Sequence, residues 1–177
     1  MTTDDTSRTL PPGVNVRLIL VRHGEPDEWA RGKCYGKLDV SLSARGSEQA
    51  RRAALWLARW PLAAVYTSPR RRAKESAEVI AAMHALDVRV EEGFCEIDFG
   101  EFEGLAYDEV AARYPEEYQA WMERPTEVTF PGGESFATMR ERVERTAAQV
   151  RRAHGGESVA IVTHGGVARI ILAGALE

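Results

Sequence analysis

The sequence predicts an α/β fold, a three-layer α/β/α sandwich with a mostly parallel central sheet. Short runs of branched apolar residues alternate with longer segments of helical periodicity, an order typical of parallel strands joined by crossover helices. The composition agrees, because 177 residues with 44% hydrophobic and 28% charged residues suit one globular domain. A formal net charge of −4 argues against a general nucleic-acid binder, and no apolar run approaches the roughly 20 residues of a membrane span.

The first sixty residues predict a tail, a strand, a loop and a helix. Residues 1–13 are rich in Thr, Asp and Pro and are expected to form a flexible tail before a single domain over 14–177. Branched apolar residues at 16–21 predict a buried strand. Residues 22–43 keep no period and contain three glycines, so we expect a long loop of the kind that often carries function. A helix follows at 44–60, between a serine cap and a proline.

The rest of the chain repeats this alternation with one interruption. A strand is expected at 63–67, and Ser68 and Pro69 are typical of a helix start with a serine cap and proline at the first helical position. A third strand is expected at 88–94, followed by an insertion at about 95–134 with one or two short helices. The remaining expected elements are a long helix that begins after Ser135 and ends at Gly155, a strand at 158–162 and a helix from Gly165 onward.

Histidines, arginines and glycines follow the predicted strands. Parallel strands bring their carboxyl ends to one edge of the sheet, where such folds bind ligands. The residues expected at this edge are Arg22-His23-Gly24-Glu25, Arg70-Arg71-Arg72 and Thr163-His164-Gly165-Gly166. We therefore expect two histidines and at least two arginines at one rim. The three glycines would let backbone N–H groups approach the same anion.

Such a cluster suits a phosphoryl group. Arginine donates paired hydrogen bonds to phosphate oxygens, and its positive charge lowers the pKa of a neighbouring histidine. A neutral imidazole is then available as a nucleophile. A metal site is the alternative, with His23, Glu25 and His164 as ligands, but guanidinium groups would repel a divalent cation and no helical His-x-x-x-His pair is present.

The sequence resembles the histidine phosphatase superfamily, the phosphoglycerate-mutase-like enzymes, in six blocks that lie in family order. The blocks begin with Leu20-Val21-Arg22-His23-Gly24-Glu25 and continue with residues 36–43, 68–73, 96–104, 131–135 and 162–169. The resemblance implies a phosphoglycerate-mutase-like fold. It also implies that His23 takes up the phosphoryl group and that Glu96 is the proton donor. The residues that it implies bind the phosphoryl oxygens are Arg22, Arg72, His164 and the backbone of Gly165. Arg72 is preferred to its two neighbours because it precedes Ala73, as in the family pattern.

The sequence departs from the family pattern in three places. Pro26 stands where many members have a threonine and Trp29 where many have an asparagine, and both of those residues would help to bind phosphate. Many members also continue after the last helix into a closing strand, whereas this sequence stops at Glu177. Either a segment beyond that residue is missing, or the sheet lacks that edge.

Several residues have both a functional and a structural interpretation. Cys34, Tyr35 and Gly36 either bind the leaving group of the substrate or pack the loop. Trp121 either covers the pocket or anchors a short helix. Glu134 either orients an active-site arginine or is a helix-start carboxylate favoured by the helix dipole. The acidic stretch 91–109 is expected to be mostly solvated, apart from Glu96.

These observations predict a metal-independent phosphomonoesterase that acts through a phosphohistidine intermediate and needs no cofactor. Pro26 and the run 32–40 are similar to the α-ribazole phosphatase branch, so α-ribazole 5'-phosphate, from cobalamin biosynthesis, is the expected substrate. The alternatives are a broad sugar or nucleotide phosphatase, a phosphoglycerate mutase, and a phosphate-binding module without catalysis. We expect a small phosphate monoester as the partner, no nucleic acid and no membrane, and leave a homodimer open. Two cysteines and an N-terminus unlike a signal peptide predict a cytoplasmic protein.

Overall fold

The computed structural model describes residues 10–176 and contains a four-stranded parallel sheet. The strands are β1 (Arg17–Arg22), β2 (Leu62–Thr67), β3 (Val88–Val90) and β4 (Ser158–Thr163). Their order in the sheet is β1-β4-β2-β3, so β4, the last of the described strands, lies between β1 and β2. This order places the carboxyl ends of β1, β4 and β2 side by side, as the α/β prediction requires.

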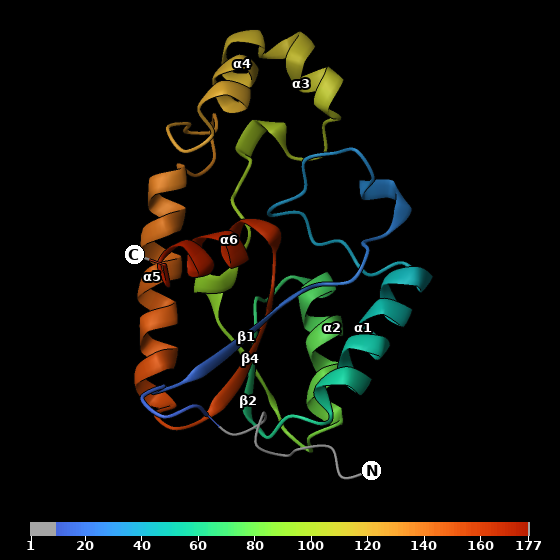
Figure 1. The fold of residues 1–177 in the computed structure, drawn as a ribbon. Coiled ribbons are helices and arrows are strands. Elements are labelled where there is room, and N and C mark those ends of the chain that lie inside the picture. The colour runs from blue at the N-terminus through green and yellow to red at the C-terminus, as the bar shows by residue number, and fades with distance from the viewer. Residues whose placement is uncertain (1–9, 177) are drawn as a thin grey trace.

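Helices cover both faces of the sheet and confirm the three-layer sandwich (Figure 1). The helices of one face are α1 (Ala44–Leu57) and α2 (Arg71–Ala82), and those of the other face are α5 (Phe136–Ala153) and α6 (Gly165–Ala173). Side chains of β1 alternate between the two layers, because Leu18 and Leu20 pack on the α5 side while Ile19 and Val21 pack on the α1 side.

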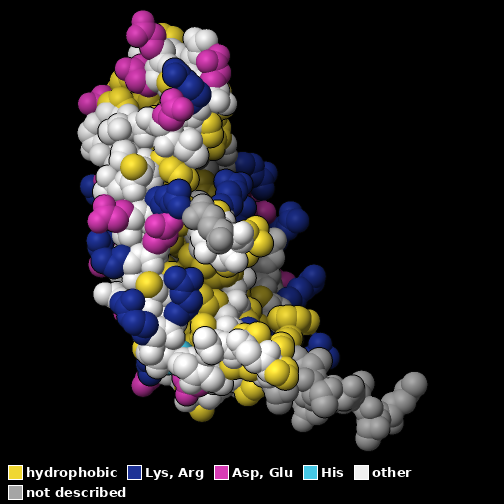
Figure 2. All heavy atoms as spheres, turned by 60° about the vertical axis from the view of Figure 1, so that its left-hand side comes forward, with side chains coloured by type: hydrophobic (Ala, Val, Ile, Leu, Met, Phe, Trp, Pro, Cys, Tyr) yellow, Lys and Arg dark blue, Asp and Glu magenta, His cyan; other side chains and the backbone are white. Residues whose placement is uncertain are grey.

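The segment between β3 and α5 forms a lobe beyond the sheet, at the top of Figure 1. It contains α3 (Tyr107–Arg113) and α4 (Pro115–Glu123), after the short 3₁₀ helices η3 (Glu92–Phe94) and η4 (Gly100–Phe102). A further 3₁₀ helix, η2 (Glu28–Ala30), lies in the loop after β1. Acidic side chains gather on the upper end of this lobe in Figure 2, and Glu116 and Glu117 stand in the first turn of α4.

Two local expectations differ from the structure, and a third, the tail, falls mostly on residues 1–9, which lie outside the described residues. The third strand ends at Val90 rather than at 94, because the chain turns there and passes close to α5, where a Cβ at Gly93 would lie 1.9 Å from the Thr146 hydroxyl. Helix α2 begins at Arg71 rather than at Pro69, because the backbone of Arg70 is extended, and the Ser68 hydroxyl bonds to His164 as well as to the Arg70 N–H. No helix in the described range is long and apolar enough to cross a membrane.

Candidate active site

The two predicted histidines meet at the carboxyl ends of neighbouring strands. His23 follows β1 and His164 follows β4, and the His23 backbone N–H donates to the Thr163 carbonyl across the two strands at 2.9 Å. The ring centroids lie 5.2 Å apart at an interplanar angle of 62°. Both side chains are buried, at 7% and 0% exposure, so the sheet itself sets their positions.

Hydrogen bonding and burial keep the His23 ring neutral with one free nitrogen. Its Nδ1 lies 2.7 Å from the Gly24 carbonyl oxygen, which can only accept, so Nδ1 carries the proton and Nε2 keeps its lone pair. Burial lowers the pKa of His23 to about 4, helped by the charges of Arg72 and Arg22 and opposed by the bond to Gly24. At neutral pH the side chain is therefore an uncharged imidazole with a lone pair on Nε2.

His164 bonds through its other ring nitrogen. Its Nε2 lies 2.7 Å from the Ser68 hydroxyl, and its Nδ1 is buried without a hydrogen-bond partner in the described chain. Burial, followed by the charges of Arg72 and His23, lowers the pKa of His164 well below its ordinary value. This ring is also neutral at neutral pH.

Only one of the three consecutive arginines faces the histidines. Arg72 is fully buried and donates to the carbonyl oxygens of Tyr35, Gly36 and Leu38 at 2.8–3.0 Å, which leaves its Nε without a partner in the described chain. Arg71 instead pairs with Glu75 on the exposed face of α2. The structure thus brings the predicted Arg72 to the histidine pocket by binding its guanidinium to the loop after β1.

Arg22 is the second arginine of the pocket and is bound less tightly. Its guanidinium carbon would lie 3.9 Å from a Cβ on Gly165, and within the described residues it makes no hydrogen bond or ion pair. The Gly165 N–H has no protein acceptor in that range either. The other two glycines differ from the expectation, because the Gly24 N–H donates to the Ser76 hydroxyl and the Gly166 N–H to Glu96.

The Glu96 carboxylate lies at the N-terminus of α6, beside the histidines. It accepts the Gly166 N–H at 3.1 Å and its neighbour Ile97 N–H at 3.1 Å. A Cβ at Gly166 would lie 2.3 Å from a Glu96 carboxylate oxygen, so a larger residue here would displace this carboxylate. Glu96, His23, His164, Arg22 and Arg72 therefore line one pocket of about 340 Å³.

Comparison with known proteins identifies the family of this arrangement. The profile of the histidine phosphatase superfamily (branch 1) matches residues 18–177. The chain belongs to the histidine phosphatase superfamily. Phosphoserine phosphatase 1 of Hydrogenobacter thermophilus is 40% identical over 149 residues, which cover 84% of this chain and 71% of that protein.

Solved structures of phosphatases share the fold. The α-ribazole phosphatase of Shigella flexneri superposes with a TM-score of 0.80 at 30% identity and covers 89% of this chain and 78% of its own. A mycobacterial glucosyl-3-phosphoglycerate phosphatase gives a TM-score of 0.83 at 29% identity, with 90% and 79% covered. The chain is accordingly a phosphoric monoester hydrolase that acts on small phosphate substrates, and the resemblance drawn from its six sequence blocks is confirmed.

The outer part of this phosphatase's pocket is aromatic. Its walls include side chains from the loop after β1, from the lobe and from the start of α5: Tyr35, Phe99, Tyr107, Trp121, Phe130 and Phe136. Cys34, which is 1% exposed, lines the same pocket. Gly36 does not line it, and its carbonyl oxygen accepts a hydrogen bond from Arg72 instead. Lys33 and Arg169 also line the pocket, so four cationic side chains share it with a single carboxylate among the described residues.

The positions that depart from the family pattern lie away from this pocket. Trp29 is 52% exposed and lines a separate surface groove, where the Lys33 ammonium lies 4.1 Å from the centre of its ring. Pro26 pairs with Leu42 in an isolated bridge. Neither residue takes the place of the phosphate-binding threonine and asparagine of other members.

The metal alternative loses its third ligand in the structure. The Glu25 carboxylate accepts from the Ser43 hydroxyl at 3.3 Å and lies 3.7 Å from Arg45, and it does not line the pocket of His23 and His164. Within residues 10–176, no three His, Cys, Asp or Glu side chains come close enough together to hold a metal ion.

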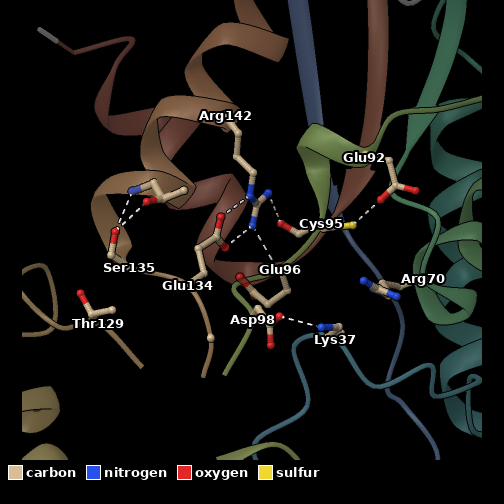
Figure 3. A pocket seen from close by; sticks show the side chains of 12 residues that line it. Lys37, Arg70, Glu92, Cys95, Glu96, Asp98, Thr129, Glu134, Ser135 and Arg142 are labelled. Carbon is tan, nitrogen blue, oxygen red and sulfur yellow. Dashed lines mark hydrogen bonds and ion pairs between the residues drawn. The ribbon is translucent and has the colours of Figure 1, made fainter. Parts of the chain in front are cut away.

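A second pocket of about 580 Å³ lies behind the segment that carries Glu96 (Figure 3). Arg142 of α5 lines this pocket, and its Nε and Nη2 donate to the two carboxylate oxygens of Glu134 at 2.7 and 2.8 Å. The same guanidinium donates to the carbonyl oxygens of Gly93, Cys95 and Glu96 at 2.7–3.2 Å. Glu134 thus orients an arginine, but that arginine does not line the pocket of His23 and His164; it holds the backbone of Glu96 from behind.

Glu103 corrects the expectation that the acidic stretch is solvated apart from Glu96. Its carboxylate accepts the backbone N–H groups of residues 36–38 at 2.7–3.2 Å and that of Phe99 at 3.1 Å. It therefore fixes the loop whose carbonyl oxygens bind Arg72. No local pattern predicts these roles of Glu103 and Arg142, because each side chain binds backbone groups far away along the chain.

Proposed function

We propose that this histidine phosphatase hydrolyses phosphate monoesters without a metal ion, through a phosphohistidine formed on His23. The lone pair on Nε2 of His23 carries this proposal, because the ring is neutral and its other nitrogen is bound to the backbone. Arg22 and Arg72 line the same pocket and supply the charge that a phosphoryl dianion needs.

In the first step Nε2 of His23 attacks phosphorus, and the bond from phosphorus to the ester oxygen breaks. Arg22, Arg72 and His164 stabilise the negative charge on the other three phosphoryl oxygens. Glu96, in its acid form, gives its proton to the leaving oxygen, so that the alcohol departs neutral. His23 then carries the phosphoryl group, and Glu96 is a carboxylate.

In the second step water attacks the phosphohistidine. The Glu96 carboxylate takes a proton from this water as the new bond to phosphorus forms, and the bond from phosphorus to Nε2 breaks. Inorganic phosphate leaves, and both His23 and Glu96 return to their starting states. The bonds from Gly166 and Ile97 keep the Glu96 carboxylate in one place for both transfers.

For the substrate we propose α-ribazole 5'-phosphate, whose leaving group carries a flat benzimidazole ring. The aromatic walls of the pocket support this choice, since rings stack on Tyr107, Trp121 and Phe136 without specific polar partners. We also propose a cytoplasmic location, since both cysteines are free and buried, as suits a reducing compartment.

Phosphoserine is the second candidate, because the Hydrogenobacter relative bears that activity in its name. Lys33 and Arg169 would pair with its carboxylate. Its ammonium group would find only Glu96 among the acidic side chains that line the pocket in the described chain, and Glu96 is already used for proton transfer. The lining therefore favours the aromatic substrate.

Trapping of the intermediate tests the reaction. Enzyme mixed with a ³²P-labelled monoester and quenched in denaturant at high pH should retain label that acid then removes, as phosphohistidine does. His23→Ala should retain none, whereas His84→Ala, a histidine outside the pocket, should label like the wild type. Label on His23→Ala overturns the nucleophile. A rate that EDTA abolishes and added metal restores overturns metal independence.

A substrate comparison tests the leaving group separately. We expect kcat/KM for α-ribazole 5'-phosphate to exceed that for phosphoserine by at least about tenfold, the worth of one good aromatic contact. An equal or higher value for phosphoserine overturns the substrate while leaving the phosphohistidine in place.

A further inference from the structure

One hydrogen bond behind the pocket has no place in the reaction described so far. Ser68, the residue directly after β2, is fully buried, as is His164. Its Oγ lies 2.7 Å from Nε2 of His164, because β2 and β4 are adjacent parallel strands whose ends meet at this edge. Ser68 does not line the pocket, so it does not touch a substrate.

The direction of this bond follows from the other partners of Ser68. The hydroxyl oxygen also receives the Arg70 backbone N–H, at 3.4 Å. If Nε2 of His164 donated as well, the oxygen would accept twice and its own proton would have no acceptor, since the described structure shows no other bond at this hydroxyl. A buried donor without an acceptor is unfavourable, and no ligand can supply one at Ser68, which does not line the pocket, whereas His164 does. The hydroxyl therefore donates to Nε2.

The proton on the His164 ring must then be on Nδ1. The ring is neutral and carries one proton, and Nε2 uses its lone pair to accept from Ser68. Nδ1 is buried and has no partner in the described protein, while the side chain lines the pocket beside His23. A protonated Nδ1 donates to a phosphoryl oxygen, whereas a lone pair there would repel it.

We propose that Ser68 is a positioning residue that fixes His164 as the Nδ1–H tautomer and thereby makes it a hydrogen-bond donor to the phosphoryl group. The inference rests on the proposed phosphohistidine reaction. His23 and His164 then share one tautomer but offer opposite nitrogens to the substrate. The bond to Gly24 leaves His23 a bare Nε2 for attack, and the bond to Ser68 leaves His164 an N–H for binding.

Nitrogen NMR reads the tautomer directly. In enzyme labelled with ¹⁵N-histidine, long-range ¹H–¹⁵N correlations at pH 7 should show a protonated Nδ1 and an unprotonated Nε2 for His164, assigned with His164→Gln. A protonated Nε2 in the wild type overturns the proposal. Such a result leaves phosphohistidine trapping intact, whereas failure of the proposed reaction removes the trapped label from the wild type, so the two failures are distinguishable.

Variants connect the tautomer to binding. Ser68→Ala should give mixed tautomers at His164, weaken inhibition by vanadate about tenfold and lower kcat/KM by a similar factor, with a residual phosphohistidine. Ser68→Thr keeps the hydroxyl and should restore both, and Ser158→Ala, a buried serine at the start of β4, should change neither. Unchanged vanadate inhibition in a folded Ser68→Ala enzyme overturns the proposal. If Ser68→Ala does not fold, the wild-type spectrum still decides.

Discussion

The two halves of the catalytic pocket are built differently. The inner half, around His23, His164 and Arg72, lies at the carboxyl ends of β1 and β4 and at the start of α2, and each of these side chains bonds to backbone or to a buried hydroxyl. The outer half consists of aromatic rings from loops and from the lobe, and Tyr107 there is 44% exposed. No residue of α4 is fully buried, although this helix carries Trp121.

This difference separates the chemistry from the choice of substrate. Groups that stabilise a transition state act best when they are already in position, and the sheet supplies that rigidity. The more exposed rings of the lobe, such as Tyr107, are expected to adjust to the shape of the alcohol. Substitutions in the inner half should therefore slow all substrates, and those in the outer half should change their ranking.

Glu96 stands between the two halves and should give the largest effect. Glu96→Gln keeps the shape but removes the proton, so the burst of released alcohol from an alkyl phosphate should slow by about 10²–10⁴-fold. The burst of p-nitrophenol, which leaves well without a proton, should slow much less. Rapid-quench measurements on both substrates decide this. Equal slowing for the two leaving groups would mean that Glu96 is not the proton donor, and Glu101→Gln is the matched control in the same acidic stretch.

A substitution of Arg22 tests whether the inner half acts on the phosphoryl charge, which all substrates share, rather than on the shape of the leaving group. Arg22→Gln should lower kcat by about 10²–10³-fold for every monoester, the usual cost of one donor to a developing charge. Because this guanidinium has no partner among residues 10–176, the urea midpoint should not change. Arg71→Gln, an exposed arginine on the same edge, should behave like the wild type. A kcat loss confined to aromatic esters would assign Arg22 to the outer half instead.

The sequence predicted the inner half because its residues adjoin apolar strands. His23 and His164 follow predicted strands directly, and the parallel order of those strands is enough to bring them together. The family blocks then selected Arg72 and Glu96. The predicted convergence needed only the positions of these residues along the chain.

The supporting residues could not be predicted in the same way. Ser68 looks like a helix cap in sequence, but its hydroxyl binds a histidine 96 positions away. Glu103 looks like one more solvated acid, but it binds the backbone of Lys37, 66 positions away. A polar side chain in sequence carries no record of which distant backbone it will reach, so such partners appear only once the fold is formed.

Burial of His23 should make the stability of the inner half depend on pH. The pKa of His23 is about 4 in the folded chain and 6.5 in the unfolded one, so between these values the unfolded chain binds a proton that the folded chain does not. Stability should therefore fall as the pH drops below 6.5. Between pH 7 and pH 5 this group contributes about 2 kcal/mol of the loss in unfolding free energy.

Urea unfolding of the wild type and His23→Gln at pH 7 and pH 5 measures this contribution. The loss on acidification should be smaller in the variant by about that amount. Identical losses in the two proteins would show that His23 titrates normally in the folded state.

Trp121 tests the outer half and should give the smallest effect. Its ring stacks near Tyr107 at an interplanar angle of 29° and contacts Phe99 and Phe130 as well as lining the pocket. If it covers the substrate, Trp121→Ala should raise KM for aromatic monoesters about tenfold and leave glycerol phosphate unchanged. Trp121→Phe retains a ring and should recover most of the difference. If it only anchors α4, KM should rise equally for aromatic monoesters and for glycerol phosphate, and amide hydrogen exchange in α4 should become faster. In that case only Tyr35 and Phe136 would remain as candidates for choosing the substrate in the outer half.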